Sequence, residues 1–305
     1  MKPVRQIAFG YSTQCNIRCG HCVASEASPE TAKMELERAI CIIQEMAGAN
    51  VTGISFTAGE PLLFFDDICE LIQICREHGI YSRIVTNGYW AKTRENADRV
   101  VSELISNGLS QLRLSYSRWH QQHINHENIL RAALSCQKYN LDYFISFVTD
   151  FSKKDDSLEQ YLRDHHLKYF PEPVIYFGRA GKFDRQLVFT DYSPNLCSMN
   201  PYLTPELDMY ACCDAASRFS ETEFLHLGNL RNESIDTLFK KTENHVLYHL
   251  IRTMGLTNMA SYLGFKASEI VEYRKCELCE KLFNSKENLS ALTKSAATDL
   301  ISWRR

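Results

Sequence analysis

The chain has 305 residues, of which 45% are hydrophobic and 23% charged, so it is long and apolar enough to fold around a sizeable core. Its formal net charge is −3 and its charges form no long run of one sign, which argues against a nucleic-acid partner and against binding to acidic membranes. No run of about 18 apolar residues predicts a membrane span, and no secretory signal precedes the first expected strand, so we expect a cytoplasmic protein.

From residue 6 to residue 177, β-rich runs alternate with amphipathic runs, the pattern of a parallel sheet covered by helices. The predicted strands are Gln6–Tyr11, Gly53–Thr57, Tyr81–Thr86, Gln111–Tyr116, Tyr143–Val148 and Val174–Phe177. Helices are predicted where apolar residues recur at steps of three and four, over Thr31–Ala47, Asp66–His78, Ala97–Ser106 and Asn128–Tyr139. The fold class is therefore α/β, either an open barrel or a doubly wound sheet. In both, ligands bind at the carboxyl ends of the strands.

The rest of the chain has a different pattern. Prolines and glycines end the β/α repeats near residue 180. Beyond this point, Glu206–Cys212 is predicted to form one arm of a hairpin and Ser234–Arg252 a helix, and the polar tail after Phe283 is expected to be a loosely docked helix. The predicted division is a domain over 1–180, a second over 181–284 and a tail over 285–305.

Twelve cysteines are the most unusual feature of the composition. A disulfide framework is expected in small secreted chains, whereas in a reducing compartment cysteines bind metals, act in catalysis or are inert and buried. Four of them lie among apolar neighbours in the predicted helices and are predicted to be core residues: Cys41, Cys69, Cys75 and Cys136.

Three cysteines, Cys15, Cys19 and Cys22, follow the first predicted strand with the spacing C-x3-C-x2-C. Three thiolates on so short a loop can hold three irons of a cubane cluster and leave the fourth iron open to another ligand. A structural zinc ion is the alternative, but it needs a fourth ligand, and His21 lies too close to its neighbours in the sequence to serve easily. The spacing therefore favours an iron–sulfur cluster with an open iron.

This array resembles the cluster motif of the radical S-adenosylmethionine (SAM) enzymes, in which His21 takes the usual aromatic position. Thr57-Ala58-Gly59-Glu60-Pro61 is similar to the family's Gly-Gly-Glu-Pro segment, which engages the methionine amino group of SAM. The resemblance covers roughly the first 180 residues and implies a partial (β/α)6 TIM-like barrel that binds a [4Fe–4S] cluster and SAM. The cofactor-binding residues that it implies are Gly59, Glu60, Asn87 and Ser115.

Five more cysteines lie in the C-terminal part, namely Cys197, the pair Cys212-Cys213, and Cys276 and Cys279 in a C-x2-C. They resemble the shortened auxiliary-cluster domain, of the twitch or SPASM-like type, of many radical SAM enzymes. Four thiolates then hold a second [4Fe–4S] cluster, with a zinc ion on the same thiolates as the alternative. Cys212 and Cys213 are neighbours in an extended segment and point to opposite sides, so one of them is spare. The spare thiol either faces the substrate or is a buried structural cysteine.

Several stretches are similar, more narrowly, to the radical SAM peptide epimerases. They are Thr86-Asn87-Gly88-Tyr89-Trp90, Leu114-Ser115-Tyr116 followed by His120, Tyr210-Ala211-Cys212-Cys213, and Cys276–Asn284. The first of the paired cysteines ligates the auxiliary cluster in that group, and the second delivers a hydrogen atom. This implies Cys197, Cys212, Cys276 and Cys279 as metal ligands, Cys213 as the catalytic donor and His120 as a substrate contact. One position differs, because those relatives carry an acid where this chain has Ser117.

The implied reaction begins when an electron donor of the flavodoxin or ferredoxin type drives the cleavage of SAM to a 5′-deoxyadenosyl radical. The radical removes a hydrogen from an amino-acid Cα of a ribosomally made peptide, and Cys213 returns one to the opposite face, which turns an L residue into a D residue. Two alternatives remain open. A dehydrogenase or peptide crosslinking enzyme (thioether or C–C), acting on a peptide or a small molecule, would use the auxiliary cluster as electron acceptor. A non-catalytic iron–sulfur or zinc module would only bind a partner.

Overall fold

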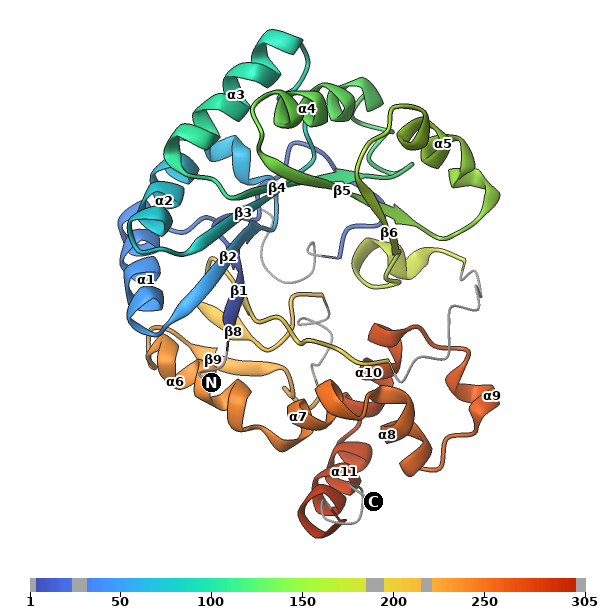
Figure 1. Cartoon of the computed structure of the whole chain (residues 1–305). Helices are drawn as coiled ribbons and strands as arrows, with labels where there is room; N and C mark the ends of the chain where they lie inside the picture. The colour runs from blue at the N-terminus through green and yellow to red at the C-terminus, as the bar shows by residue number, and fades with distance from the viewer. Residues whose placement is uncertain (1–3, 24–31, 185–194, 215–220, 300–305) are drawn as a thin grey trace. The chain divides into compact units, whose positions relative to one another are not determined.

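The computed structural model describes residues 4–23, 32–184, 195–214 and 221–299 (Figure 1). The chain divides into two compact units, which we call unit 1 (Met1–Gln186 with Leu203–Glu206) and unit 2 (Leu187–Tyr202 with Leu207–Arg305). Within the described ranges, no helix is both long enough and apolar enough to cross a membrane.

Unit 1 is built on a parallel sheet whose six strands lie in the order β6-β5-β4-β3-β2-β1. The strands are β1 (Arg5–Gly10), β2 (Val51–Thr57), β3 (Tyr81–Thr86), β4 (Gln111–Tyr116), β5 (Asp142–Thr149) and β6 (Tyr169–Pro173). They follow one another around an arc with the helices on its outer side (Figure 1). This arrangement confirms the predicted α/β fold of the partial-barrel type. Because the strands are parallel, their carboxyl ends meet at one edge of the sheet.

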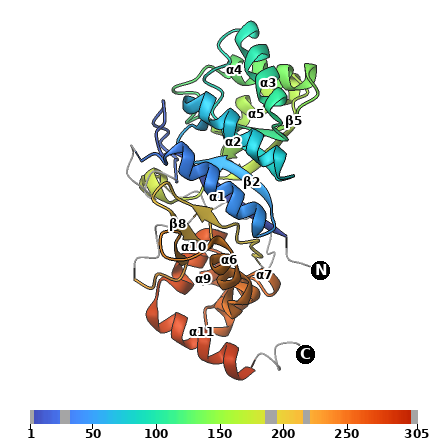
Figure 2. The same ribbon diagram turned by 90° about the vertical axis from the view of Figure 1, so that its left-hand side faces the viewer.

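In the part of unit 1 that the structure describes, five α-helices cover the sheet: α1 (Leu36–Gly48), α2 (Phe65–Glu77), α3 (Arg94–Asn107), α4 (His126–Lys138) and α5 (Asp156–Asp164). The 3-10 helices η2 (Pro61–Phe64), η3 (Lys153–Asp155) and η4 (Gly178–Lys182) lie in the connections. Helix α1 packs against α2, and α2 against α3, as Figure 2 shows. Each of the first four helices buries residues at positions i, i+3, i+4 and i+7, and in α2 these are Ile68, Leu71, Ile72 and Cys75. This spacing gives one apolar stripe for the sheet.

The sixth strand was predicted wrongly, because β6 spans Tyr169–Pro173 and not Val174–Phe177. Pro171 and Pro173 lack an N–H and argue against a central strand, but β6 lies at the end of the strand order, where proline is tolerated. The apolar run after it is buried in a cluster that contains Trp119, Val174 and Tyr176. Its apolar residues thus reflect burial in a loop and not a strand.

Two further predictions, one on the start of the first helix and one on the helical cysteines, are also corrected. The helix begins at Leu36, and Thr31 lies outside the described residues. Cys41 is exposed and Cys69 is half-buried, whereas Cys75 and Cys136 are buried as predicted. Cys41 follows the buried Ala39 by two positions, which turns its side chain toward the opposite side of the helix.

Unit 2 contains an antiparallel pair of strands, β8 (Asp208–Tyr210) and β9 (His226–Asn229), and the two-residue β7 (Tyr202–Leu203) lies where the division into units falls. Its helices are α6 (Ile235–Asn244), α7 (Val246–Thr253), α8 (Leu256–Tyr262), α9 (Ala267–Ile270), α10 (Lys275–Phe283) and α11 (Lys286–Asp299). The predicted hairpin arm and the helical tail are confirmed. The helix predicted over Ser234–Arg252 is instead interrupted at His245, whose backbone is extended.

Candidate functional site

The carboxyl edge of the sheet in unit 1 collects the residues that the sequence singled out there. The loop after β1 carries Cys15, which is exposed, Cys19, which is buried, and Cys22, which is half-buried. The segments after β2 and β3 carry Glu60 and Asn87. The parallel sheet therefore brings these segments to one edge, and the contacts between them define the site.

The segment after β2 is locked onto the cysteine loop. The N–H of Glu60 donates to the carbonyl of Gln14 at 2.8 Å, and a Cβ on Gly59 would stand 2.2 Å from that same oxygen. Ala58 and Gly59 both have left-handed backbones, with φ of 67° and 56°. Glycine adopts this conformation freely, whereas an alanine there costs about 1–2 kcal/mol, so the chain tolerates strain at Ala58.

Glu60 has a fully buried carboxylate that ties β2 to β3. It accepts hydrogen bonds from the Thr86 hydroxyl at 2.7 Å, the Asn87 backbone N–H at 2.7 Å and the Leu62 N–H at 3.2 Å. Burial raises its pKa to about 7, and these hydrogen bonds oppose the rise. The charge of the Glu60 carboxylate therefore changes as the pH passes through neutrality.

Asn87 reaches from the end of β3 to the cysteine loop. Its side-chain amide donates to the Asn16 side chain at 2.9 Å and to the Cys15 sulfur at 3.9 Å. Asn87 is therefore in direct contact with the cysteine loop.

Ser115 is half-buried in β4, and the described residues give its hydroxyl no hydrogen-bond partner.

The three cysteines of the loop interact with one another. Burial raises the pKa of the Cys19 thiol to about 12, and repulsion from Cys22 and Cys15 adds to the rise. The Arg179 guanidinium works in the opposite direction and also donates to the Cys19 carbonyl at 2.8 Å. A thiolate at Cys19 thus needs positive charge, which a bound metal provides.

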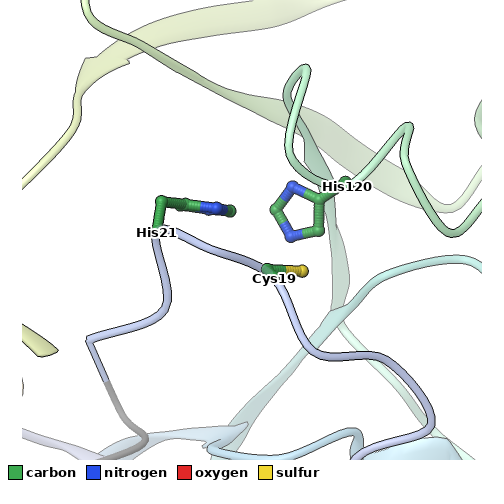
Figure 3. A group of neighbouring side chains, drawn as sticks. All are labelled: Cys19, His21 and His120. Carbon is green, nitrogen blue, oxygen red and sulfur yellow. The ribbon is translucent and has the colours of Figure 1, made fainter. Parts of the chain in front are cut away.

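Two histidines lie beside Cys19, as Figure 3 shows. One ligand atom each of Cys19, His21 and His120 lies within 4.8 Å of the others, and all three residues are buried. The His21 Nδ1 is buried and has no hydrogen-bond partner among the residues that the structure describes, and burial lowers the pKa of His21 to about 4. Burial also lowers the pKa of His120 well below its usual range. Sequence reasoning set His21 aside as a ligand and assigned His120 to the substrate, but the structure places both beside Cys19.

Sequence reasoning offered Trp119 as a pocket-lining or packing residue, and the structure places it in a wall behind His21. Trp119 stacks between His21, at 4.9 Å, and Phe183, at 5.4 Å between ring centroids. The Arg118 guanidinium lies 4.1 Å from the Trp119 ring centroid and pairs with Asp150 and Asp155. His21, Trp119 and Phe183 are far apart in the sequence and follow no shared motif, so no local signal groups the three rings.

Gly178 and Arg179, at the start of η4, hold the other side of the cysteine loop. The Arg179 N–H donates to the Cys22 carbonyl at 3.1 Å, and a Cβ on Gly178 would stand 2.4 Å from the same oxygen. Sequence reasoning placed a domain boundary near this segment. The left-handed backbone of Gly178, with φ of 58°, permits a close approach to the cysteine loop.

The second cysteine group lies in unit 2. Cys276 and Cys279 are three residues apart in α10 and so share one face of the helix. Desolvation, and then repulsion from Cys212 and Cys197, raise the pKa of Cys279 well above its usual value. The four predicted ligands, Cys197, Cys212, Cys276 and Cys279, are therefore near enough to interact. The contacts of Cys212 include the Asp214 N–H, 3.4 Å from its sulfur.

Cys213 is an exposed residue, whereas its neighbour Cys212 is half-buried. The Cys213 thiol donates to the Asp214 carboxylate at 3.5 Å. Burial, and then the charges of Asp214, Cys212 and Cys276, raise the pKa of the Cys213 thiol well above its usual value. Both members of the pair thus lie near the cysteine group, and they differ in the exposure of the residue as a whole.

The chain is similar to several known proteins. The family model described as the radical SAM superfamily matches residues 11–164. The Bacillus subtilis (strain 168) protein YydG, whose name assigns it provisionally to peptide biosynthesis, is 23% identical over 306 aligned residues that cover 94% of both chains. PqqA peptide cyclase of Methylorubrum extorquens (strain PA1) is 30% identical over 76 residues, which cover 25% of this chain and 20% of the relative.

Among solved structures, anSMEcpe with bound AdoMet has the same fold with a TM-score of 0.60 and 16% identity, covering 98% of both chains. The family match includes Cys15, Cys19, Cys22, Glu60 and Asn87 and spans just over half of the chain. The chain therefore belongs to the radical SAM superfamily, and this membership implies a [4Fe–4S] cluster and SAM as cofactors.

Proposed function

We propose that this radical SAM protein modifies a ribosomally made peptide by converting an L residue to its D form. Similarity to YydG along almost the whole chain supports a peptide substrate, since the name of that protein refers to peptide biosynthesis. The observation that supports the inversion is Cys213, an exposed residue whose thiol lies near Cys212 and Cys276 and has a pKa raised well above its usual value by burial.

The first cysteine loop fits the SAM-binding cluster. Cys15, Cys19 and Cys22 would hold three of its irons, and the iron would supply the positive charge that a Cys19 thiolate needs. When bound, the cluster and SAM supply the one-electron chemistry that removes a hydrogen atom from an unactivated carbon.

Gly59, Glu60, Asn87 and Ser115 would contact SAM at the same edge of the sheet. The Glu60 carboxylate holds the Asn87 backbone and would attract the methionine ammonium of SAM through its charge. Gly59 lets this segment pack against the Gln14 carbonyl, which would leave its backbone polar groups to contact SAM. These residues would orient the cofactor and keep water from it.

Cys197, Cys212, Cys276 and Cys279 would hold a second [4Fe–4S] cluster, and residues 181–284 would then form an auxiliary-cluster domain of the twitch or SPASM-like type. A zinc ion is the other occupant that four thiolates accept. Iron analysis of the reconstituted protein separates the two.

Cys213 would donate its hydrogen atom to the face of the substrate Cα opposite to the one that lost a hydrogen. A C–H bond forms as the S–H bond breaks, and the sulfur is left one electron and one proton short. An external donor of the flavodoxin or ferredoxin type would supply the electron. Asp214, which accepts the hydrogen bond of the thiol, stands where it can return the proton.

The test is an anaerobic reaction in D2O with SAM, dithionite and candidate peptides encoded beside the gene of this protein. Because a thiol exchanges its hydrogen with solvent, inversion predicts a product one mass unit heavier that contains a D residue deuterated at Cα. A product with unchanged chirality contradicts the proposal.

A crosslinking or dehydrogenating reaction is the second candidate. The cysteine group of unit 2 favours it, because a second cluster would accept an electron from the substrate, and one relative is named a peptide cyclase. Such a product would have lost two hydrogens and be lighter by two mass units. The same mass measurement therefore separates the two functions.

A further inference from the structure

His120 lies in the turn after β4, where Ser117 fixes the orientation of its ring. The Ser117 hydroxyl oxygen accepts the His120 backbone N–H at 3.2 Å and lies 2.8 Å from the His120 Nδ1. Both residues are buried, and Ser117 is fully inaccessible. A buried hydroxyl hydrogen needs an acceptor, and among the described residues Nδ1 is the one that Ser117 has.

This arrangement sets the tautomer of His120. When the hydroxyl donates to Nδ1, that nitrogen carries a lone pair, and a neutral imidazole then carries its hydrogen on Nε2. An acid at position 117, as in the epimerase-like pattern, would instead accept a hydrogen from Nδ1. The serine of this chain thus makes Nε2 the donor nitrogen of the ring.

The second ring nitrogen of His120 faces the sulfur of Cys19 (Figure 3). Ligand atoms of the two residues lie within 4.8 Å, and the His21 ring packs edge-on against His120 with centroids 4.7 Å apart. The stack of His21 on Trp119 limits the rotation of both imidazoles. An N–H dipole is therefore held close to a sulfur in a buried environment.

We propose that His120 tunes the SAM-binding cluster by directing its Nε2–H toward Cys19, which raises the reduction potential of the cluster. The inference rests on the proposed role of Cys19 as an iron ligand. Reduction adds negative charge that spreads to the sulfurs, so a donor aimed at one of them stabilises the reduced form. The effect is strong in a buried site because the local dielectric is low. His120 is a positioning residue that acts through Cys19.

The experiment compares the wild-type protein with His120→Phe, His120→Gln and Ser117→Ala, each reconstituted anaerobically. The reduced SAM-binding cluster is identified as the electron paramagnetic resonance signal that changes when SAM is added, and that signal is followed during a redox titration. Iron content and SAM affinity are measured alongside, so that a loss of cluster is not mistaken for a shift in potential.

We expect His120→Phe to shift the midpoint to more negative potential, because phenylalanine keeps an aromatic ring and loses the donor. Glutamine keeps an N–H near the same place, so the midpoint potential of His120→Gln should lie close to that of the wild type. Ser117→Ala keeps His120 but frees its tautomer, and should fall between the wild type and His120→Phe.

Equal potentials in the wild type, His120→Phe and Ser117→Ala overturn the inference, and so does a glutamine variant that behaves like phenylalanine. If His120→Phe holds no cluster, the Ser117→Ala comparison still decides. A wild-type protein that binds iron but shows no signal sensitive to SAM contradicts the proposed function itself, which is a different result from an unchanged midpoint.

Discussion

The two cysteine groups of this protein are held in different ways. In unit 1, segments from three other parts of the chain grip the cysteine loop: Glu60 bonds Gln14, Asn87 bonds Asn16, and Arg179 bonds the Cys19 and Cys22 carbonyls. In unit 2, two of the thiols come from a single turn of α10, and the neighbouring Cys213 is left exposed. A loop that several hydrogen bonds hold in place suits a cofactor that must not move, whereas an exposed cysteine suits a residue that must react with a substrate.

Removing ligands tests this division of roles with the largest expected effect. Cys19→Ala should abolish the formation of 5′-deoxyadenosine from SAM, because the loop would lose a ligand of the SAM-binding cluster. The paired change Cys276→Ala with Cys279→Ala should lower the iron content from about eight to about four atoms per chain and keep some SAM cleavage. Iron analysis and chromatography of deoxyadenosine check both. Loss of SAM cleavage in the unit 2 variant, with its SAM-sensitive signal intact, would contradict separate roles.

Glu60→Gln tests the contribution of the segment after β2 to SAM binding. Replacing the carboxylate by an amide removes one charged interaction, and we expect SAM to bind about 10–100-fold more weakly. Calorimetry of SAM binding to the reconstituted, oxidised protein measures this. An unchanged affinity would show that the carboxylate serves the fold alone.

The pH dependence of the same binding gives a second measurement. Because burial raises the pKa of Glu60 to about 7, the carboxyl takes up a proton as the pH falls below that value and loses the charge that attracts the ammonium. The dissociation constant for SAM should therefore rise by up to about tenfold per unit as the pH falls from 7 toward 6. Glu60→Gln should lack this rise.

Gly178→Ala tests the close contact between η4 and the cysteine loop. The new Cβ would stand 2.4 Å from the Cys22 carbonyl at a left-handed φ, so the loop or η4 must move, and we expect a loss of about 1–3 kcal/mol of stability. Gly181→Ala is the matched control, because its Cβ would stand 3.6 Å from the nearest atom, the Tyr176 carbonyl. Chemical denaturation compares the two variants. Equal stabilities would show that the close approach at Gly178 is not required.

Ala58→Gly should have the smallest effect. It removes a left-handed alanine that costs about 1–2 kcal/mol, but glycine loses about 0.4–1 kcal/mol more entropy on folding, so the variant should gain about 0.5 kcal/mol. A higher midpoint of thermal unfolding checks this gain. A clear loss of stability would mean that the alanine methyl packs well enough to outweigh the strain.

Sequence reasoning predicted the parts of the site that are encoded in short stretches of sequence. The spacing of Cys15, Cys19 and Cys22 and the position of Glu60 after β2 are local patterns, and the parallel sheet brings them to one edge. Packing across distant segments could not be predicted in this way. The stack of His21 on Trp119 and the approach of Gly178 depend on how loops fold over the sheet, and no spacing encodes them. The error at β6 has the same origin. Its prolines argue against a central strand, but β6 lies at the edge of the sheet, where proline is tolerated, and the sequence does not show which strand is at the edge.

The most direct test of the central claim is the reaction of Cys213→Ala in D2O, with Cys212→Ala alongside it. The account predicts that Cys213→Ala still forms deoxyadenosine and keeps its full iron content but gives no deuterated D residue, whereas Cys212→Ala loses iron from the second cluster. A Cys213→Ala protein that still inverts the peptide and incorporates deuterium at Cα would contradict the account.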